Sequence, residues 1–85
     1  MAAVFERLKK IIIEQLGAAE ESVTPSASFA YDLNADLSDL AELVTTIERE
    51  FSTPKRKVEV SYEDMKNFFT VQDVIDYLSD HSIED

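Results

Sequence analysis

Cysteine and tryptophan are absent from this 85-residue sequence, and only one glycine and two prolines are present. Without cysteine, the chain can form no disulfide, no thiol nucleophile and no cysteine-ligated metal site. Because few residues break helices, long helices with short connections are favoured over a turn-rich sheet fold. The chain is 45% hydrophobic and 31% charged, which is typical of a folded protein. At this length we expect a single domain over residues 1–85.

Basic residues are scarce as well: eight Lys and Arg stand against eighteen Asp and Glu, for a net charge of -10. Nucleic-acid binding needs clustered basic residues, so we expect no nucleic-acid partner. The charge favours a basic protein surface as partner, although acidity also serves solubility alone. The sequence contains no apolar run long enough for a signal peptide or a membrane span. We therefore expect a cytoplasmic monomer that does not bind membranes.

Apolar residues recur at helical spacing over 2–16, and Gly17 is placed to end that helix because glycine accepts a left-handed conformation. The segment 18–31 is predicted to be a loop, with Val23 and Phe29 as its anchors in the core.

A second helix is predicted after Asp36, which is a good N-cap, with Asp39 in the first turn where negative charge is favoured. At 100° per residue, one face of this helix holds the residues expected in the core, with Leu37 and Leu43 on its flanks. The central members of that face are Leu40, Val44, Ile47 and Phe51. Ser38 falls on another side, with Thr45 and Arg49, and its hydroxyl is expected to face solvent.

Pro54 follows this helix and precedes a basic run, Lys55-Arg56-Lys57. Ser61 to Asp64 has capping spacing and opens a short helix through about Asn67, with Met65 and Phe68 turned inward. Thr70 to Asp73 repeats the capping signal for a last helix. The residues therefore predict an all-α fold, a small four-helix bundle with a short third helix.

An ordered set of fragments along nearly the whole chain resembles the acyl carrier protein family. The fragments are residues 11–17, Val23-Thr24, Ser28-Phe29, Asp32-Leu33, Ala35-Asp36, Glu42-Leu43-Val44, Ile47-Glu48, Glu50-Phe51, and 70–73 with 75–77. The resemblance implies a carrier that is not an enzyme. It also implies a 4'-phosphopantetheine arm on a serine at the start of the second helix, sheltering of the cargo between the helices, and a role in fatty-acid or polyketide biosynthesis.

The attachment motif departs from the family pattern. The family reads Asp-Ser-Leu, whereas this chain reads Asp36-Leu37-Ser38, with Leu37 in the serine's usual place. One step along a helix moves a hydroxyl by about 1.5 Å and turns it by about 100°. The resemblance assigns a metal-holding role during transfer of the arm to the aspartate before the serine; here Asp36 precedes Ser38 by two residues and Asp39 follows it directly. The candidate cofactor-binding residues are thus Ser38, Asp36, Asp39 and Leu37.

Two further departures concern docking. Where the family exposes apolar residues on its second helix, this chain has Ser38, Ala41 and Thr45, which form a smaller and more polar patch. The connection after Phe51 is longer than usual and brings in the basic run. This run either alters docking or is an ordinary solvated loop.

Other chemistries find less support. The single histidine, His81, lies in the polar C-terminal segment, and nothing places it beside Ser38 as a catalytic base. Asp32, Asn34, Asp36 and Ser38 alternate like half of a calcium-binding loop. However, Leu37 and Leu43 stand where that loop needs glycine and a bidentate acid. Weak divalent-ion binding by the acidic loop stays open, and we assign no dedicated metal site.

The sequence leaves two functions. In the first, Ser38 carries the arm, which holds acyl or polyketide-type chains as thioesters, and the partners are a pantetheinyl transferase and acyl-processing enzymes with basic surfaces. In the second, the arm is lost, Ser38 is an ordinary helix-start serine, and the chain acts as an acidic interaction or regulatory module.

Overall fold

The computed structural model describes residues 3–81 and contains four α-helices, with no β-strand in that range. They are α1 (Ala3–Leu16), α2 (Leu37–Phe51), α3 (Tyr62–Met65) and α4 (Val71–Asp80), with a 3-10 turn, η1 (Glu20–Ser22), after α1. The predicted all-α bundle with a short third helix is confirmed. None of the described helices combines the length and the apolar character needed to cross a membrane.

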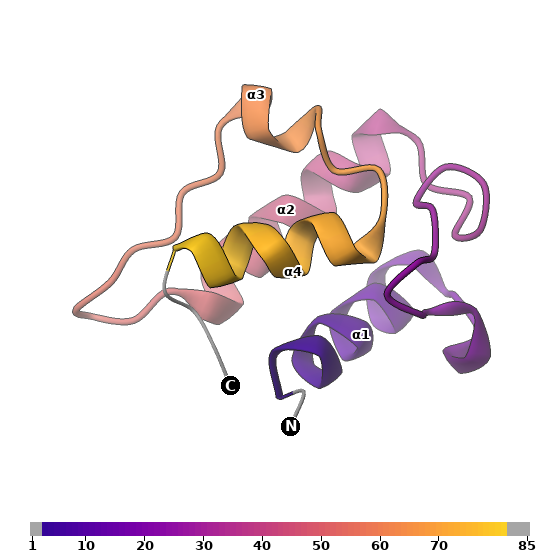
Figure 1. Ribbon diagram of the computed structural model, residues 1–85, viewed down its shortest axis with the longest axis horizontal. Helices are drawn as coiled ribbons and strands as arrows, with labels where there is room; N and C mark the ends of the chain where they lie inside the picture. Colours follow the sequence, from indigo (N-terminus) through magenta and orange to yellow (C-terminus); the bar gives the residue numbers. More distant parts are fainter. Residues whose placement is uncertain (1–2, 82–85) are drawn as a thin grey trace.

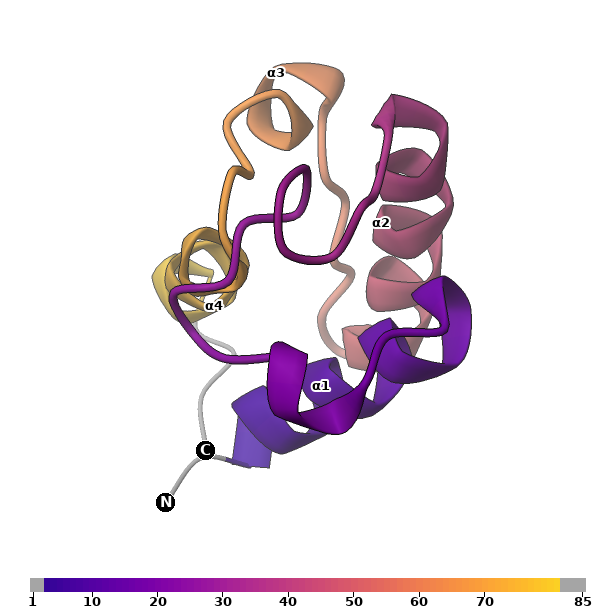
Figure 2. The ribbon, with the colours of Figure 1, turned by 90° about the vertical axis from the view of Figure 1, so that its right-hand side faces the viewer.

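The helices surround one apolar core (Figure 1). In Figure 2, α2 and α4 lie on opposite sides, with α1 below them and α3 above. Every large side chain with less than 2% exposure is aliphatic, and these side chains come from all three longer helices and the first loop: Leu8, Ile12, Leu43, Ile47, Leu78, Val23, Val71 and Val74. Burial of these aliphatic side chains is the main favourable contribution to folding.

Each α-helix, the short α3 included, begins or ends at a local signal that the sequence predicted. Gly17 ends α1 in the left-handed region (φ 65°), and its N–H donates to the Ile13 carbonyl at 3.0 Å. At α4, the Thr70 hydroxyl accepts from the Asp73 N–H, and the Asp73 carboxylate accepts from the Thr70 N–H at 3.0 Å. At α3, Ser61 caps the Asp64 N–H at 3.1 Å.

The long first loop is fastened to the start of α4. Val23 and Phe29 are buried, as predicted, and Ala27 joins them. The first N–H groups of a helix have no partner inside it; here the Val71 N–H donates to the Ala27 carbonyl (3.1 Å) and the Gln72 N–H to the Pro25 carbonyl (2.8 Å). These bonds fix the loop, and with it the chain that leads into α2.

A side-chain contact also ties α1 to the end of α2. The Arg7 guanidinium lies 3.0 Å from the Glu50 carboxylate, donates to the Glu50 carbonyl at 2.9 Å, and sits 4.4 Å from the centre of the Phe51 ring. This contact could not be predicted from local spacing because the two partners are 43 residues apart.

Candidate functional site

The chain reverses direction immediately before α2. Asn34 lies in the left-handed region (φ 56°), which asparagine tolerates better than most residues. The Ala35 N–H then donates to the Phe29 carbonyl at 2.7 Å. Because Phe29 is buried, the start of α2 is anchored to the core within a few residues of its first turn.

Asp36 and Asp39 form a reciprocal cap at this helix start. The Asp36 carboxylate accepts from the Asp39 N–H at 2.8 Å, and the Asp39 carboxylate accepts from the Asp36 N–H at 3.2 Å. The predicted N-cap is confirmed, and Asp39 has a further role that its place in the first turn did not reveal. Each carboxylate thus commits one oxygen to the backbone.

Ser38 is the second residue of α2 and is exposed, as predicted. Ala41 and Thr45, one and two turns further along, are exposed with it. Within the described residues, the Ser38 hydroxyl makes no hydrogen bond. It is therefore directly accessible from solvent.

Leu37 corrects a prediction. The sequence placed it on the flank of the core face, but its side chain is 54% exposed, whereas Leu43, the other predicted flank residue, is fully buried. Leu37 is the first residue of α2, and its side chain lies at an open groove. Helical phase gives an angle around the axis, but it does not show that the space beside Leu37 is open to solvent.

The groove beside Leu37 has a volume of about 460 Å³ and is lined by residues from three separate parts of the chain. The first loop contributes residues 28–31, α2 contributes Leu37 and Leu40, and the region from α3 to α4 contributes Tyr62, Met65, Lys66, Phe68 and Phe69. The fold brings Tyr31 of the first loop and Tyr62 of α3 to the same groove. Ser38 does not line it.

The family model described as "Phosphopantetheine attachment site" matches residues 6–78, which is most of the chain. The chain belongs to this family of phosphopantetheine-binding carriers. Members of the family are not catalysts: they bear 4'-phosphopantetheine and work with the enzymes that modify the arm and its cargo. The resemblance drawn from the sequence fragments is thereby confirmed.

In the acidic loop of this carrier domain, the aspartate carboxylates accept hydrogen bonds from backbone N–H groups. The Asp32 carboxylate accepts from the Ser28 N–H at 2.7 Å, while Asp36 and Asp39 cap α2. Over residues 3–81, no cluster of three or more His, Cys, Asp or Glu is placed to hold a metal ion. Of the four residues that alternate like half a calcium loop, Asp32 and Asp36 thus accept backbone N–H groups that build the turn and cap α2.

Tyr77 is in the last turn of α4 and His81 is its C-cap. This C-terminal end of α4 lies away from the start of α2 (Figure 1). The Tyr77 and His81 rings stack at 4.1 Å, and the Tyr77 hydroxyl donates to the Glu59 carbonyl at 2.9 Å. Burial raises the pKa of Tyr77, and the negative charges of Asp64 and Glu48 raise it further. Neither side chain lines the groove beside Leu37.

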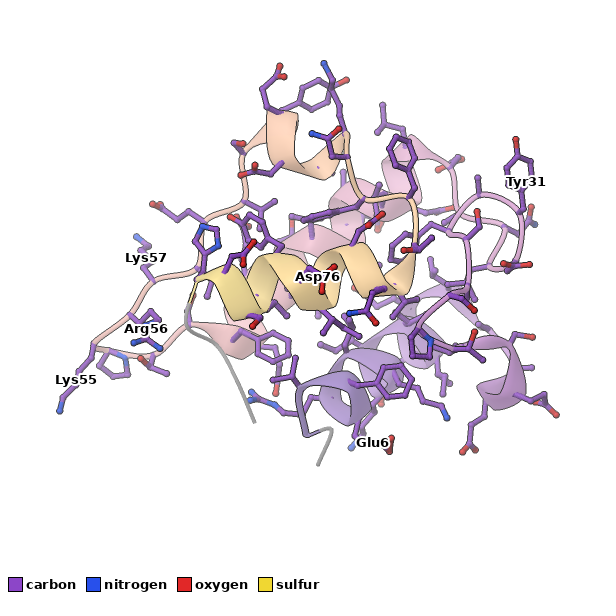
Figure 3. The ribbon with its side chains drawn as sticks, in the orientation of Figure 1. Glu6, Tyr31, Lys55, Arg56, Lys57 and Asp76 are labelled. Carbon is purple, nitrogen blue, oxygen red and sulfur yellow. The ribbon has the colours of Figure 1, made fainter. Side chains whose placement is uncertain are left out.

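The basic run lies at the far end of the carrier domain from Tyr31, as Figure 3 shows for Lys55, Arg56 and Lys57. It is an exposed turn closed by the Thr53 N–H donating to the Arg56 carbonyl at 2.7 Å. The 15 residues of α2 separate this turn from Ser38, a distance of about 20 Å at 1.5 Å per residue. An enzyme docked at the start of α2 would contact these cations only with a second, distant surface.

Proposed function

We propose that this chain is an acyl carrier that holds acyl or polyketide-type intermediates as thioesters on a 4'-phosphopantetheine arm attached to Ser38. The observation that carries this proposal is the position of Ser38, an exposed hydroxyl in the first turn of α2 within a chain of the carrier family. Three other serines, Ser28, Ser52 and Ser61, each accept a backbone N–H.

The start of α2 suits a phosphodiester. The first N–H groups of a helix and its dipole place partial positive charge where the phosphate would sit. Asp36 and Asp39 each commit one oxygen to the cap, which leaves their negative charge beside Ser38 to help hold a divalent ion during transfer of the arm. When bound, the arm supplies the thiol that forms the thioester. The protein holds the arm and offers it to partner enzymes, for which basic surfaces suit the net charge of -10.

The test is the intact mass of the purified protein after incubation with coenzyme A, Mg²⁺ and a broad-specificity pantetheinyl transferase. We expect a gain of one phosphopantetheine in the wild type and none in Ser38→Ala. The double variant Leu37→Ser/Ser38→Leu restores the family's Asp-Ser-Leu order and serves as the positive control. Modification of that double variant but not of the wild type, also with the transferase of the source organism, would refute attachment at Ser38.

A second function is favoured by one specific observation. Leu37 stands exposed in the place of the family's serine, and Ser38 is turned from it by about 100°. If this rotation of the hydroxyl prevents modification, the chain is a carrier-like module without an arm that works by docking its acidic surface on another protein. The mass experiment distinguishes the two functions directly.

A further inference from the structure

The exposed large apolar side chains of the described residues gather around the groove beside Leu37. They are Tyr31, Leu37, Tyr62 and Phe69, with exposures of 92%, 54%, 58% and 66%. Single exposed apolar residues are ordinary on a protein surface, but a contiguous set marks an interaction site. All four residues line the one groove of about 460 Å³, and we call this set the aromatic rim.

The aromatic rim stands on a rigid base. Phe29, Leu40, Met65 and Phe68 line the groove and are buried in the core. The rim backbone is also fixed, because the Phe69 carbonyl accepts from the Phe29 N–H at 3.0 Å and the Phe69 N–H donates to Asp73 at 2.9 Å. A surface that is ordered before binding loses less conformational entropy when a partner docks.

The rim side chains point away from the body of the protein, as Figure 3 shows for Tyr31. A side chain that is 92% exposed has almost all of its surface available to a second molecule and covers little of the groove. The arrangement therefore suits an apolar side chain inserted from outside more than a chain enclosed within the bundle.

The charges around the rim define the partner. Asp36 lines the groove, Asp32 adjoins Tyr31, and Glu63 lies 3.5 Å from Lys66, the groove's one cation. A second copy of this chain would bring like charge against like charge, since the net charge is -10. The complementary surface is an apolar side chain flanked by lysine or arginine.

The rim also adjoins Ser38, because Leu37 precedes it directly. On the outward face of α2, by contrast, Ala41 and Thr45 offer no large apolar side chain. We propose that the enzyme acting on Ser38 docks on the aromatic rim with one apolar side chain flanked by basic residues. This inference rests on the proposed function, in which Ser38 is modified. The outward face of α2 is not the main contact.

The experiment compares three charge reversals at exposed glutamates, using the broad-specificity transferase as the probe. Glu63→Lys reverses a charge beside the rim, next to Tyr62 and Lys66, Glu42→Lys reverses one on the outward face of α2, and Glu21→Lys is a remote control. We expect Glu63→Lys, and separately Phe69→Ser, to raise KM for the carrier about tenfold with little change in kcat. The other two charge reversals should remain near the wild-type KM.

A second measurement keeps docking separate from modification. Ser38→Ala, labelled with ¹⁵N, is titrated with the transferase, and amide shifts are expected at the rim and not along Ala41 to Thr45. Shifts confined to the outward face, or no binding, would overturn the docking proposal even if the wild type gains the arm. If loading the ¹⁵N-labelled wild type with an octanoyl arm shifts amides at the groove, while transferase binding to Ser38→Ala shifts none there, the groove holds the cargo and the docking proposal is overturned too. Rim shifts without any mass gain would support docking and refute attachment.

Discussion

Replacing Asp36 by asparagine and by alanine separates its two roles at the start of α2. The carboxylate accepts the Asp39 N–H at 2.8 Å, a bond that an asparagine side-chain oxygen can also make. Both variants lose a negative charge beside the helix dipole, which costs about 0.3–1 kcal/mol. Only alanine also loses the cap, at a further cost of about 1 kcal/mol.

For a domain of this size, 1 kcal/mol corresponds to a change in Tm of about 4–8 °C. We therefore expect a Tm order of wild type, then Asp36→Asn, then Asp36→Ala, with the last two separated by about that interval. Thermal unfolding followed by circular dichroism measures the order, and Glu14→Gln controls for loss of one charge elsewhere. Equal Tm values for the asparagine and alanine variants would refute the capping assignment.

The same pair of variants tests the proposed role of Asp36 in transfer of the arm. Asp36→Asn keeps the cap but lacks the charge, so we expect slower modification of Ser38 in a protein that is destabilised by only about 0.3–1 kcal/mol and stays folded. The rate is followed by intact mass at several Mg²⁺ concentrations. An asparagine variant that is modified at the wild-type rate would leave Asp36 with the capping role alone.

Three further predictions concern the fold. Leu43→Ala should lower the free energy of unfolding by about 2–5 kcal/mol because Leu43 is fully buried, while Leu37→Ala should change it by less than about 0.5 kcal/mol. Urea unfolding measures both losses, and equal losses would contradict the exposed position of Leu37. Gly17→Ala should cost about 1 kcal/mol through its positive φ alone, since a Cβ there meets nothing within 4 Å, and an unchanged urea midpoint would refute this. Because the folded-state pKa of Tyr77 is raised, its contribution to stability is complete below the unfolded pKa of about 10 and is lost as the pH rises toward the folded pKa. In urea unfolding from pH 8 to 11, the free energy of unfolding should therefore fall more steeply with pH in wild type than in Tyr77→Phe.

Local signals explain why the bundle could be predicted from the sequence. The caps at Asp36, Ser61 and Thr70 and the stop at Gly17 act within one helical turn, so they leave their mark on adjacent residues. The exposure of Ser38 followed from helical phase in the same way. Helical phase, however, gives only an angle around the axis, and for that reason Leu37 was wrongly placed against the core.

Residue spacing and capping signals were enough to predict where α2, α3 and α4 begin, which helix faces are apolar and the acidic charge, although α3 ends at Met65 and not at about Asn67. Three features needed the folded structure: the first loop caps α4, Arg7 pairs with Glu50, and Tyr31, Tyr62 and Phe69 line one groove with Leu37. These contacts join residues far apart in the chain, and their positions depend on how the whole core packs. Residue spacing and helix propensity cannot predict such long-range contacts, because their geometry is set only when all the helices have packed together.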